Sequence, residues 1–355
     1  DGKSPRFSLE RATSGVNFLH VKLKNGFTYG MLNEFLTGFS DNGALNPGEG
    51  IFKGNSDRVI FTVYEYSDTQ NGNVVTMESY SDAVEKNPGL AARHPKSAAA
   101  PRLMGDGELA YFLAFDTGFI LSSVFPGVED PAQEAFKLLG AVPLFSNDLK
   151  AIISSARISI ACVTKDKKLN TAYALIETEA PESLNKLYSM ISFLGLPRTE
   201  LQGWDSAFST SIPNFGLGTQ NVVLAHGKGV LLSGIGSAED FAKSPETPEE
   251  YKEFLSQDDI VNGVVSAKLY DALLDMAQNM PSSAPNADSS PNEASIAMIT
   301  AIRDSLDFAG GKVSASGKGY GKYVSSKDGN RIKALFGVFS HVVQQATGTA
   351  ASESE

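Results

Sequence analysis

The sequence is poor in the residue types that build metal sites and covalent crosslinks. It has one cysteine, Cys162, so a disulfide within the chain and a multi-cysteine zinc site are both excluded. No H-x-x-x-H or H-E-x-x-H motif occurs, and a zinc hydrolase is not expected. The residue pattern indicates no catalytic constellation, no cofactor site and no metal ligands. The histidines are His20, His94, His226 and His341, none within five residues of another.

Positive charge and long apolar runs are also scarce. Lys and Arg number 30 against 41 Asp and Glu, which gives a formal net charge of −11, and the basic residues are scattered. Such a chain repels a phosphate backbone or an anionic lipid surface on average, so nucleic-acid binding is not expected. No apolar run approaches the ~18 residues that a membrane-spanning helix needs, so no transmembrane segment is expected.

The two ends of the chain carry an expectation about location. The chain begins Asp1-Gly2-Lys3 without Met, and no signal peptide is visible. We interpret this as removal of a secretory or lipoprotein leader, which predicts an exported, periplasmic or cell-surface bacterial protein, although a shortened cytosolic protein would begin in the same way. The small, polar residues from about 347 to 355 predict a disordered tail.

Internal repetition is the main signal in what the chain does contain. Hydrophobic residues make up 42%, enough for a substantial core. Two segments share one amphipathic helical spacing, in which apolar residues recur at i, i+3, i+4, i+7 and i+10. The matched residues lie 148 positions apart. They are Leu184, Leu187, Tyr188, Ile191 and Leu194 in one copy, and Ile332, Leu335, Phe336, Phe339 and Val342 in the other.

The strands and hairpins around these helices repeat as well. Residues 172–176 match 320–324 at the same spacing of 148, and Ile158 matches Val313 at 155. This difference predicts seven extra residues in the first hairpin loop, 164–170, because loops absorb length differences at little cost. Upstream hairpins are expected at 58–79, which turns at Asn71-Gly72, and at 221–235.

These patterns predict an α+β fold. We expect two similar halves, each an antiparallel hairpin sheet covered by helices, which arose by internal duplication. The N-terminal half would span residues 1–200 and the C-terminal half residues 201–355, with the boundary near 195–203.

Several motif-like segments have simpler explanations. Ser40-Asp41-Asn42 and Ser183-x-x-Lys186 resemble motifs of penicillin-binding enzymes, but their order is reversed and no Lys-Thr-Gly is present. The glycine-rich segment 310–319 has the wrong spacing for a phosphate loop and predicts a hairpin. Segment 67–78 has Ser67 and Thr69 where a calcium loop needs Asp, so a hairpin turn explains it better.

A few single residues are candidates for a role in the core or in binding. Cys162 alternates with Ile158 and Ile160, which predicts a buried small hydrophobe and not a nucleophile. Trp204, the only tryptophan, is expected in the core or at an interface between halves. Six phenylalanines could line an apolar cavity or fill an ordinary core, namely Phe112, Phe115, Phe119, Phe125, Phe136 and Phe145.

Three segments, 171–184, 222–233 and 237–241, carry a resemblance that extends over about residues 105–280. The order of their units resembles a group of exported bacterial proteins of unknown function that repeat strand–helix and hairpin–helix pairs. The resemblance implies fold and location, and it offers no catalytic residues.

The expected function is therefore a non-catalytic binding or structural role in the cell envelope or outside the cell. Its partner would be a protein or an apolar small molecule. The alternatives are a carrier of an apolar ligand and a hydrolase that uses scattered carboxylates, since two acids suffice for glycoside hydrolysis.

Overall fold

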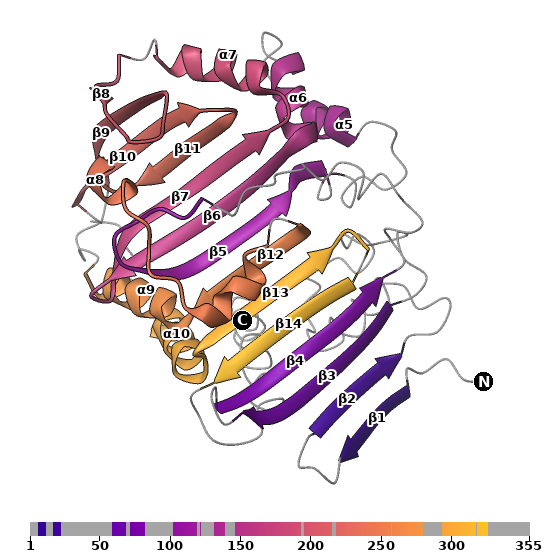
Figure 1. Ribbon diagram of the computed structural model, residues 1–355. Helices are drawn as coiled ribbons and strands as arrows, with labels where there is room; N and C mark the ends of the chain where they lie inside the picture. The colour runs from indigo at the N-terminus through magenta and orange to yellow at the C-terminus, as the bar shows by residue number, and fades with distance from the viewer. Residues whose placement is uncertain are drawn as a thin grey trace, which may run out of the picture.

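The protein folds around one antiparallel sheet of 14 strands (Figure 1). Its strand order is β1-β2-β3-β4-β14-β13-β12-β5-β6-β7-β11-β10-β9-β8. The computed structural model describes residues 6–11, 17–22, 59–68, 72–81, 102–118, 121, 131–138, 146–192, 195–214, 218–256, 258–279, 293–316 and 318–325.

The strands and helices have the following bounds. The strands are β1 (Arg6–Arg11), β2 (Asn17–Lys22), β3 (Val59–Asp68), β4 (Gly72–Ser81), β5 (Glu108–Asp116), β6 (Ala156–Lys165), β7 (Lys168–Thr178), β8 (Arg198–Thr199), β9 (Ser206–Asn214), β10 (Gly218–Gly227), β11 (Val230–Ile235), β12 (Asp259–Ser266), β13 (Phe308–Ser314) and β14 (Lys318–Ser325). The helices are α5 (Pro131–Leu138), α6 (Ser146–Ser155), α7 (Pro181–Ser192), α8 (Ala238–Phe241), the 3-10 helix η2 (Glu249–Phe254), α9 (Ala267–Asn279) and α10 (Glu293–Ser305).

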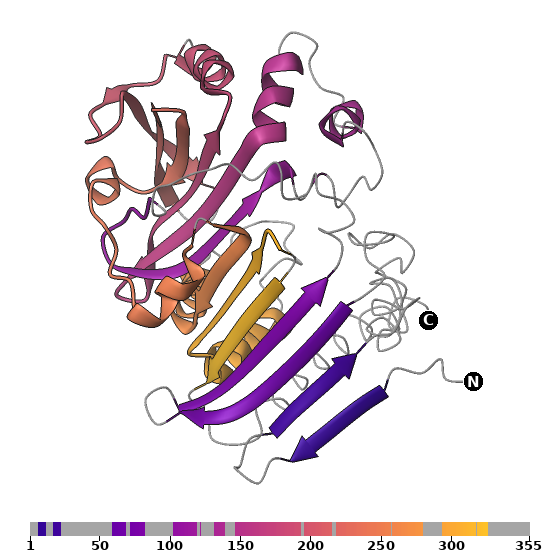
Figure 2. The same cartoon turned by 45° about the vertical axis from the view of Figure 1, so that its right-hand side comes forward.

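The two halves of the sheet have the same pattern of connected strands when each is followed outward from the centre. The centre lies between β12 and β5, and each is followed outward by a hairpin, β13–β14 or β6–β7. The hairpin that precedes β5 in the chain, β3–β4, pairs with β14, while the hairpin that precedes β12, β10–β11, pairs with β7. Figure 2 shows the sheet running from β1–β4 at the bottom to β8–β11 at the top. We call β5–β11 the β5 half and the remaining strands the β12 half.

The two central strands share an irregularity. β5 shifts register around Ala110 where it pairs with β6, and β12 shifts around Ile260 where it pairs with β13. Each shift is a β-bulge, which bends a strand and increases its twist. The two bulged residues lie 150 positions apart, as do Asp116 and Ser266, the last residues of the two strands.

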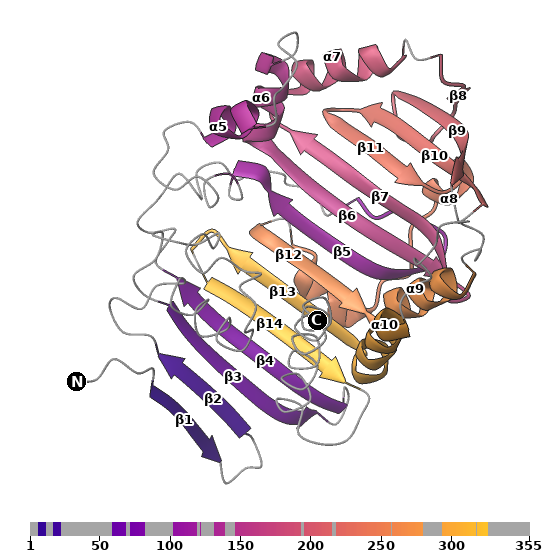
Figure 3. The same cartoon turned by 180° about the vertical axis from the view of Figure 1, so that it is seen from behind.

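The sheet has two faces that are covered differently. On the core face, side chains such as Phe112, Val163 and Leu175 pack with Phe241 of α8 and Phe254 of η2. Each large apolar side chain buried there contributes about 1.5–3 kcal/mol to stability. On the opposite face, the helix face, α9 contacts β5, β6, β7 and β12. α8 and η2 lie in front of the sheet in Figure 1, and α9 and α10 lie in front of it in Figure 3.

A buried polar network joins the halves at the centre. The guanidinium of Arg157 in β6 donates to Asp116 Oδ1 at 2.7 Å and to Asn262 Oδ1 of β12 at 2.6 Å. It also donates to the carbonyl of Asp259 at 2.8 Å, and the Asn262 amide donates to the carbonyl of Phe254 at 2.7 Å. Arg157 and Asp116 are each 1% exposed. This network fixes β6 relative to β12 across the intervening β5.

The fold confirms the α+β prediction, but the halves do not have separate sheets. Strands from residues 1–200 and 201–355 alternate in one sheet, because the hairpins cross between the halves. The residue pattern also missed α6 and β9. The expected helix at 332–342 and the tail from 347 lie outside the described residues.

Candidate binding pocket

A large hollow lies at the β8–β9 end of the sheet. It has a volume of about 990 Å³ and lies between two short walls, residues 199–207 and residues 237–242. A volume of this size suits a small ligand or part of a larger one. Both walls are loop-rich, so their shape depends on the contacts that hold them to the sheet.

The first wall is built around Trp204. Its ring is partly buried against the core, and the guanidinium of Arg102 lies 4.5 Å from the ring centroid. Arg102 also donates to the carbonyl of Gly203, whose φ of +83° suits glycine. The Asp205 backbone amide donates to the carbonyl of His226, and the Asp205 carboxylate accepts from the amide of Lys228. These contacts fix the wall on the β10–β11 turn.

The second wall is the single turn of α8. Ser237 caps it, since its hydroxyl accepts from the Asp240 amide while the Asp240 carboxylate accepts from the Ser237 amide. Phe241 is 2% exposed and makes an edge-on contact with Tyr173 at 5.8 Å. A Cβ at Gly234 would lie 2.6 Å from the Phe241 ring, so this strand position must be glycine for α8 to dock.

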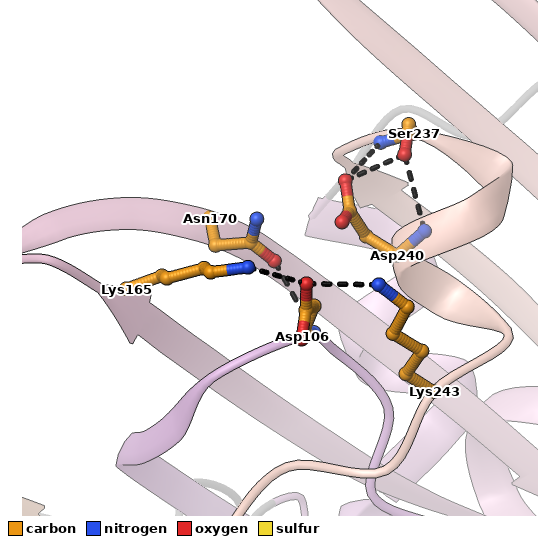
Figure 4. Close-up of polar contacts among 6 residues, drawn as sticks. All are labelled: Asp106, Lys165, Asn170, Ser237, Asp240 and Lys243. Atoms are coloured by element: carbon orange, nitrogen blue, oxygen red, sulfur yellow. Dashed lines mark hydrogen bonds and ion pairs between the residues drawn. The ribbon is translucent and has the colours of Figure 1, made fainter.

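Residues 102–107 hold both walls. At one end Arg102 binds the first wall, and at the other Asp106 accepts from Lys165 at 2.7 Å and from Lys243, just past α8, at 2.9 Å (Figure 4). The Gly105 amide also donates to the carbonyl of Lys243 at 2.9 Å. The hydrogen bond from Lys165 and then that from Lys243 hold the pKa of Asp106 below its usual value. Asp106 is thus an anionic anchor for the second wall.

The pocket lining is acidic. The described residues that line it include the acidic Glu200, Asp205 and Glu239 and the hydroxyl-bearing Thr199, Ser206 and Ser237, and none of the described lining residues is Lys, Arg or His. Arg102, which lies over Trp204, is engaged with that ring and with the carbonyl of Gly203. The negative charge of this lining therefore attracts cations and repels anions.

Three residues of types that can act in catalysis, Ser206, His226 and Cys162, make other contacts or are partly buried. Ser206 is directly paired with His226 across β9 and β10, but its hydroxyl accepts from the Tyr188 hydroxyl at 3.1 Å. The His226 ring stacks on Tyr188 at 4.9 Å, and burial lowers the pKa of His226. Cys162 is partly buried, and burial raises the pKa of its thiol to about 11. It is therefore a poor nucleophile at neutral pH, in line with the expectation for this residue.

Other predicted features have structural roles where the structure describes them. Ser183 and Lys186 both bind Asp148 of α6, at 2.9 and 3.0 Å, so this serine–lysine pair joins two helices. Segment 310–319 forms the β13–β14 hairpin, and segment 67–78 lies in the β3–β4 hairpin. Among the described residues, no group of three or more His, Cys, Asp or Glu could hold a metal ion. No described helix is both long and apolar enough to cross a membrane.

The remaining predicted residues are divided between the core and the undescribed part of the chain. Phe112 is 2% exposed in the core, and Phe115 is partly buried on the helix face. The structure describes only the backbone of His20 and Phe136. Several other predicted residues lie wholly outside the described part of the chain, namely residues 40–42, His94, Phe119, Phe125, Phe145 and His341.

A second, apolar hollow of about 480 Å³ lies on the helix face over β5, β12, β13 and β14. Its side chains include Leu113, Val261 and Val265, with glycines between them. It is wide enough for the apolar cavity expected of a carrier.

Known proteins give no further guide to the pocket. No family model matches the chain, and neither a curated protein nor a solved structure matches it.

Proposed function

We propose that this chain is a non-catalytic binding protein that takes a small, positively charged ligand in the pocket between residues 199–207 and α8. One observation carries the proposal: the described residues that line this hollow of about 990 Å³ include three acidic residues and no basic one. Carboxylates and hydroxyls accept hydrogen bonds, so the ligand would combine positive charge with N–H or O–H donors.

The way the walls are held supports binding. Arg102 and Asp106 fix the two walls from one short segment, and Phe241 anchors α8 in the core. A pocket with fixed walls loses little conformational freedom when a ligand enters, which favours affinity. A role in the bacterial envelope or outside the cell is part of the proposal, and it is supported by the resemblance in residues 105–280. Cell fractionation tests that location.

The fluorescence of Trp204 tests the proposal, because it is the only tryptophan and lines the pocket. Titration with spermidine should change the emission in a saturable way, and added salt should weaken the binding. Citrate, an anion, should have no effect. Glu239→Gln should weaken spermidine binding, and the matched control Glu249→Gln, on η2 outside the pocket, should not. Equal binding by all three proteins, or no binding to any, overturns the proposal.

A hydrolase that uses two carboxylates is the second candidate, because Glu200, Asp205 and Glu239 share one pocket. Glycoside hydrolysis needs two acids about 5–9 Å apart. Incubation with a panel of nitrophenyl glycosides tests this candidate. Release of nitrophenol that Glu200→Gln or Glu239→Gln abolishes would favour the enzyme over the binding protein.

Internal duplication is the proposed origin of the fold. Its support is the strand order, which is symmetric about β12 and β5, and the bulges at Ala110 and Ile260. The pairing registers revise the predicted spacings. Arg157 and Phe308 pair with the last residues of β5 and β12 at a spacing of 151, and Tyr173 corresponds to Tyr320 at 147. The β6–β7 hairpin is therefore four residues longer than β13–β14, not seven, and the extra residues lengthen its strands and not its loop, because only Asp166 and Lys167 separate β6 from β7.

A further inference from the structure

His226, the last residue but one of β10, connects the candidate binding pocket to α7. Its carbonyl accepts from the amide of Asp205 at 3.0 Å, and its direct pair on β9 is Ser206. Both of these neighbours line the pocket. A Cβ at the next residue, Gly227, would lie 3.1 Å from the Asp205 amide nitrogen and 3.4 Å from the Cα of Trp204. The first wall of the pocket therefore rests directly on the end of β10.

The ring of His226 is held by α7 on the helix face. Ala225 points into the core, so the alternation of β10 places the next side chain on the opposite face. There the ring stacks on Tyr188 with the ring centroids 4.9 Å apart, and the Tyr188 hydroxyl donates to the Ser206 hydroxyl at 3.1 Å. The histidine, the tyrosine and the serine thus form one set of contacts that ties α7 to the first wall.

The neutral form of the His226 ring suits these surroundings. Its Nε2 atom is buried and has no hydrogen-bond partner among the described residues. A neutral imidazole can leave one nitrogen without a proton, whereas the charged imidazolium carries a proton on both. Protonation therefore buries a charged N–H group without an acceptor, which destabilises the stacked arrangement. In agreement with this geometry, burial holds the pKa of His226 below its ordinary value.

The charged group that opposes this effect is Asp205, whose negative charge favours the protonated ring. The other described ionisable groups around the ring are Tyr188 of α7, Arg198 of β8, which acts on that tyrosine, and Lys228 in the β10–β11 turn. The direct pair of His226 on β11 is the uncharged Leu231. Because Asp205 also lines the pocket, a proton on His226 and a cationic ligand compete for the same carboxylate.

We propose that protonation of His226 expels the cationic ligand from the pocket, so that this chain binds at neutral pH and releases in mild acid. The inference rests on the proposed function, because it needs a cation in the pocket. The proton acts in two ways: it weakens the stack that ties α7 to the first wall, and it places a like charge near the ligand. Since coupling between two binding events is reciprocal, a bound cation must also make His226 harder to protonate by the same factor.

Spermidine titrations at about pH 7.5 and about pH 5.0, followed by Trp204 emission, test the proposal. The amines of spermidine and the carboxylates of the pocket stay mostly ionised at both values, because their ordinary pKa values lie outside this range. The native chain should bind about tenfold more weakly at the lower pH. His226→Phe keeps an aromatic ring on Tyr188 but cannot be protonated, so its affinity should fall less than about threefold. The matched control His20→Phe, on β2 at the other end of the sheet, should behave as the native chain.

The outcomes separate this inference from the proposed function. If the native chain and His226→Phe both bind at pH 7.5 and weaken equally in acid, the inference is wrong while the binding pocket stands. If the native chain does not bind spermidine at pH 7.5, both are wrong. His226→Gln, also uncharged, replaces the phenylalanine variant if that variant does not fold.

Nuclear magnetic resonance of the native chain reads the same coupling from the proton side. Saturating spermidine should lower the pKa of one histidine ring by about one pH unit, the counterpart of a tenfold change in affinity. The signal of that ring should be missing from the His226 variant. A chain that binds spermidine without a change in the pKa of this histidine overturns the inference.

Discussion

The two halves of the sheet have the same strand order but fill it with different residues. Along one row, the β5 half carries Leu113, Ile160 and Ala174, while the β12 half carries three glycines. At the ends of the central strands, Asp116 faces Arg157 in one half and Ser266 faces Phe308 in the other. The same strand order therefore forms with different side chains at corresponding positions, because the hydrogen bonds that pair the strands are made by the backbone.

The two halves also differ in whether they carry the candidate binding pocket. The β5 half carries the acidic pocket, whose walls follow β8 and β11. It needs Arg102 and Asp106, which precede β5 in the chain. At the spacing of 150 that separates the bulges, Asp106 corresponds to Ser256, which has no charge. Only the β5 half therefore has this charged anchor.

The largest expected effect follows loss of the buried cation. Arg157→Met should lower the free energy of unfolding by about 3–5 kcal/mol, because it leaves the carboxylate of Asp116 buried without its partner. The double change Asp116→Ser with Arg157→Phe, which imports the residues of the other half, should restore part of the loss. Urea unfolding of the three proteins measures both. A double variant no more stable than the single one would show that the halves are not interchangeable here.

A smaller loss is expected from Gly310→Ala on the core face. A Cβ there would lie 2.3 Å from Cδ2 of Phe254, which is fully buried and stacked on Tyr320. Overpacking of this kind costs about 1–3 kcal/mol. The control is Ser159→Ala, at the corresponding position of β6, where the side chain becomes smaller. Thermal unfolding of both variants should separate them, and equal losses would speak against a packing difference between the halves.

The acid sensitivity of the two halves should differ through Asp106. Since Lys165 and Lys243 hold its folded pKa below the ordinary value, its stabilising effect is complete above the unfolded pKa of about 3.9. The effect is lost as the pH falls through the folded pKa. Asp106→Asn should therefore reduce the drop in melting temperature on acidification below about pH 4, followed by Trp204 emission. An unchanged acid profile in the variant would exclude Asp106 as the anchor.

The smallest effect is expected at Cys162, whose counterpart in the register of β13 is Val313. Cys162→Val should change the free energy of unfolding by less than about 1 kcal/mol, because both are small apolar side chains of similar volume. In the native chain the thiol should react slowly with a disulfide reagent at pH 8, since burial raises its pKa to about 11. A fast reaction without denaturant would contradict its burial.

Local structure followed from the residue pattern where short-range signals agree. Pro181 begins α7, and Leu184, at the first apolar position predicted on its face, is 1% exposed. The hairpins at 221–235 and 310–319 were likewise predicted from turn residues and alternation. The α6 helix was missed because its ten residues carry only a weak apolar period, and β9 because its serines and threonine lack a strong alternation.

Register and long-range pairing were decided by the tertiary structure. The predicted spacing of 148 differs from the observed 147 by one residue, and in a strand a slip of one residue exchanges the two faces. Nothing in the order of residues shows that β4 pairs with β14 and β11 with β7, since hydrogen bonding between backbones is the same for any partner. The pocket depends on the same pairing, which brings Arg102 to Trp204 and Asp106 to Lys243. The sequence by itself determined an acidic, cysteine-poor α+β chain, because composition and periodicity are local. Where those elements meet depends on contacts between residues more than a hundred positions apart, and only the fold supplies them.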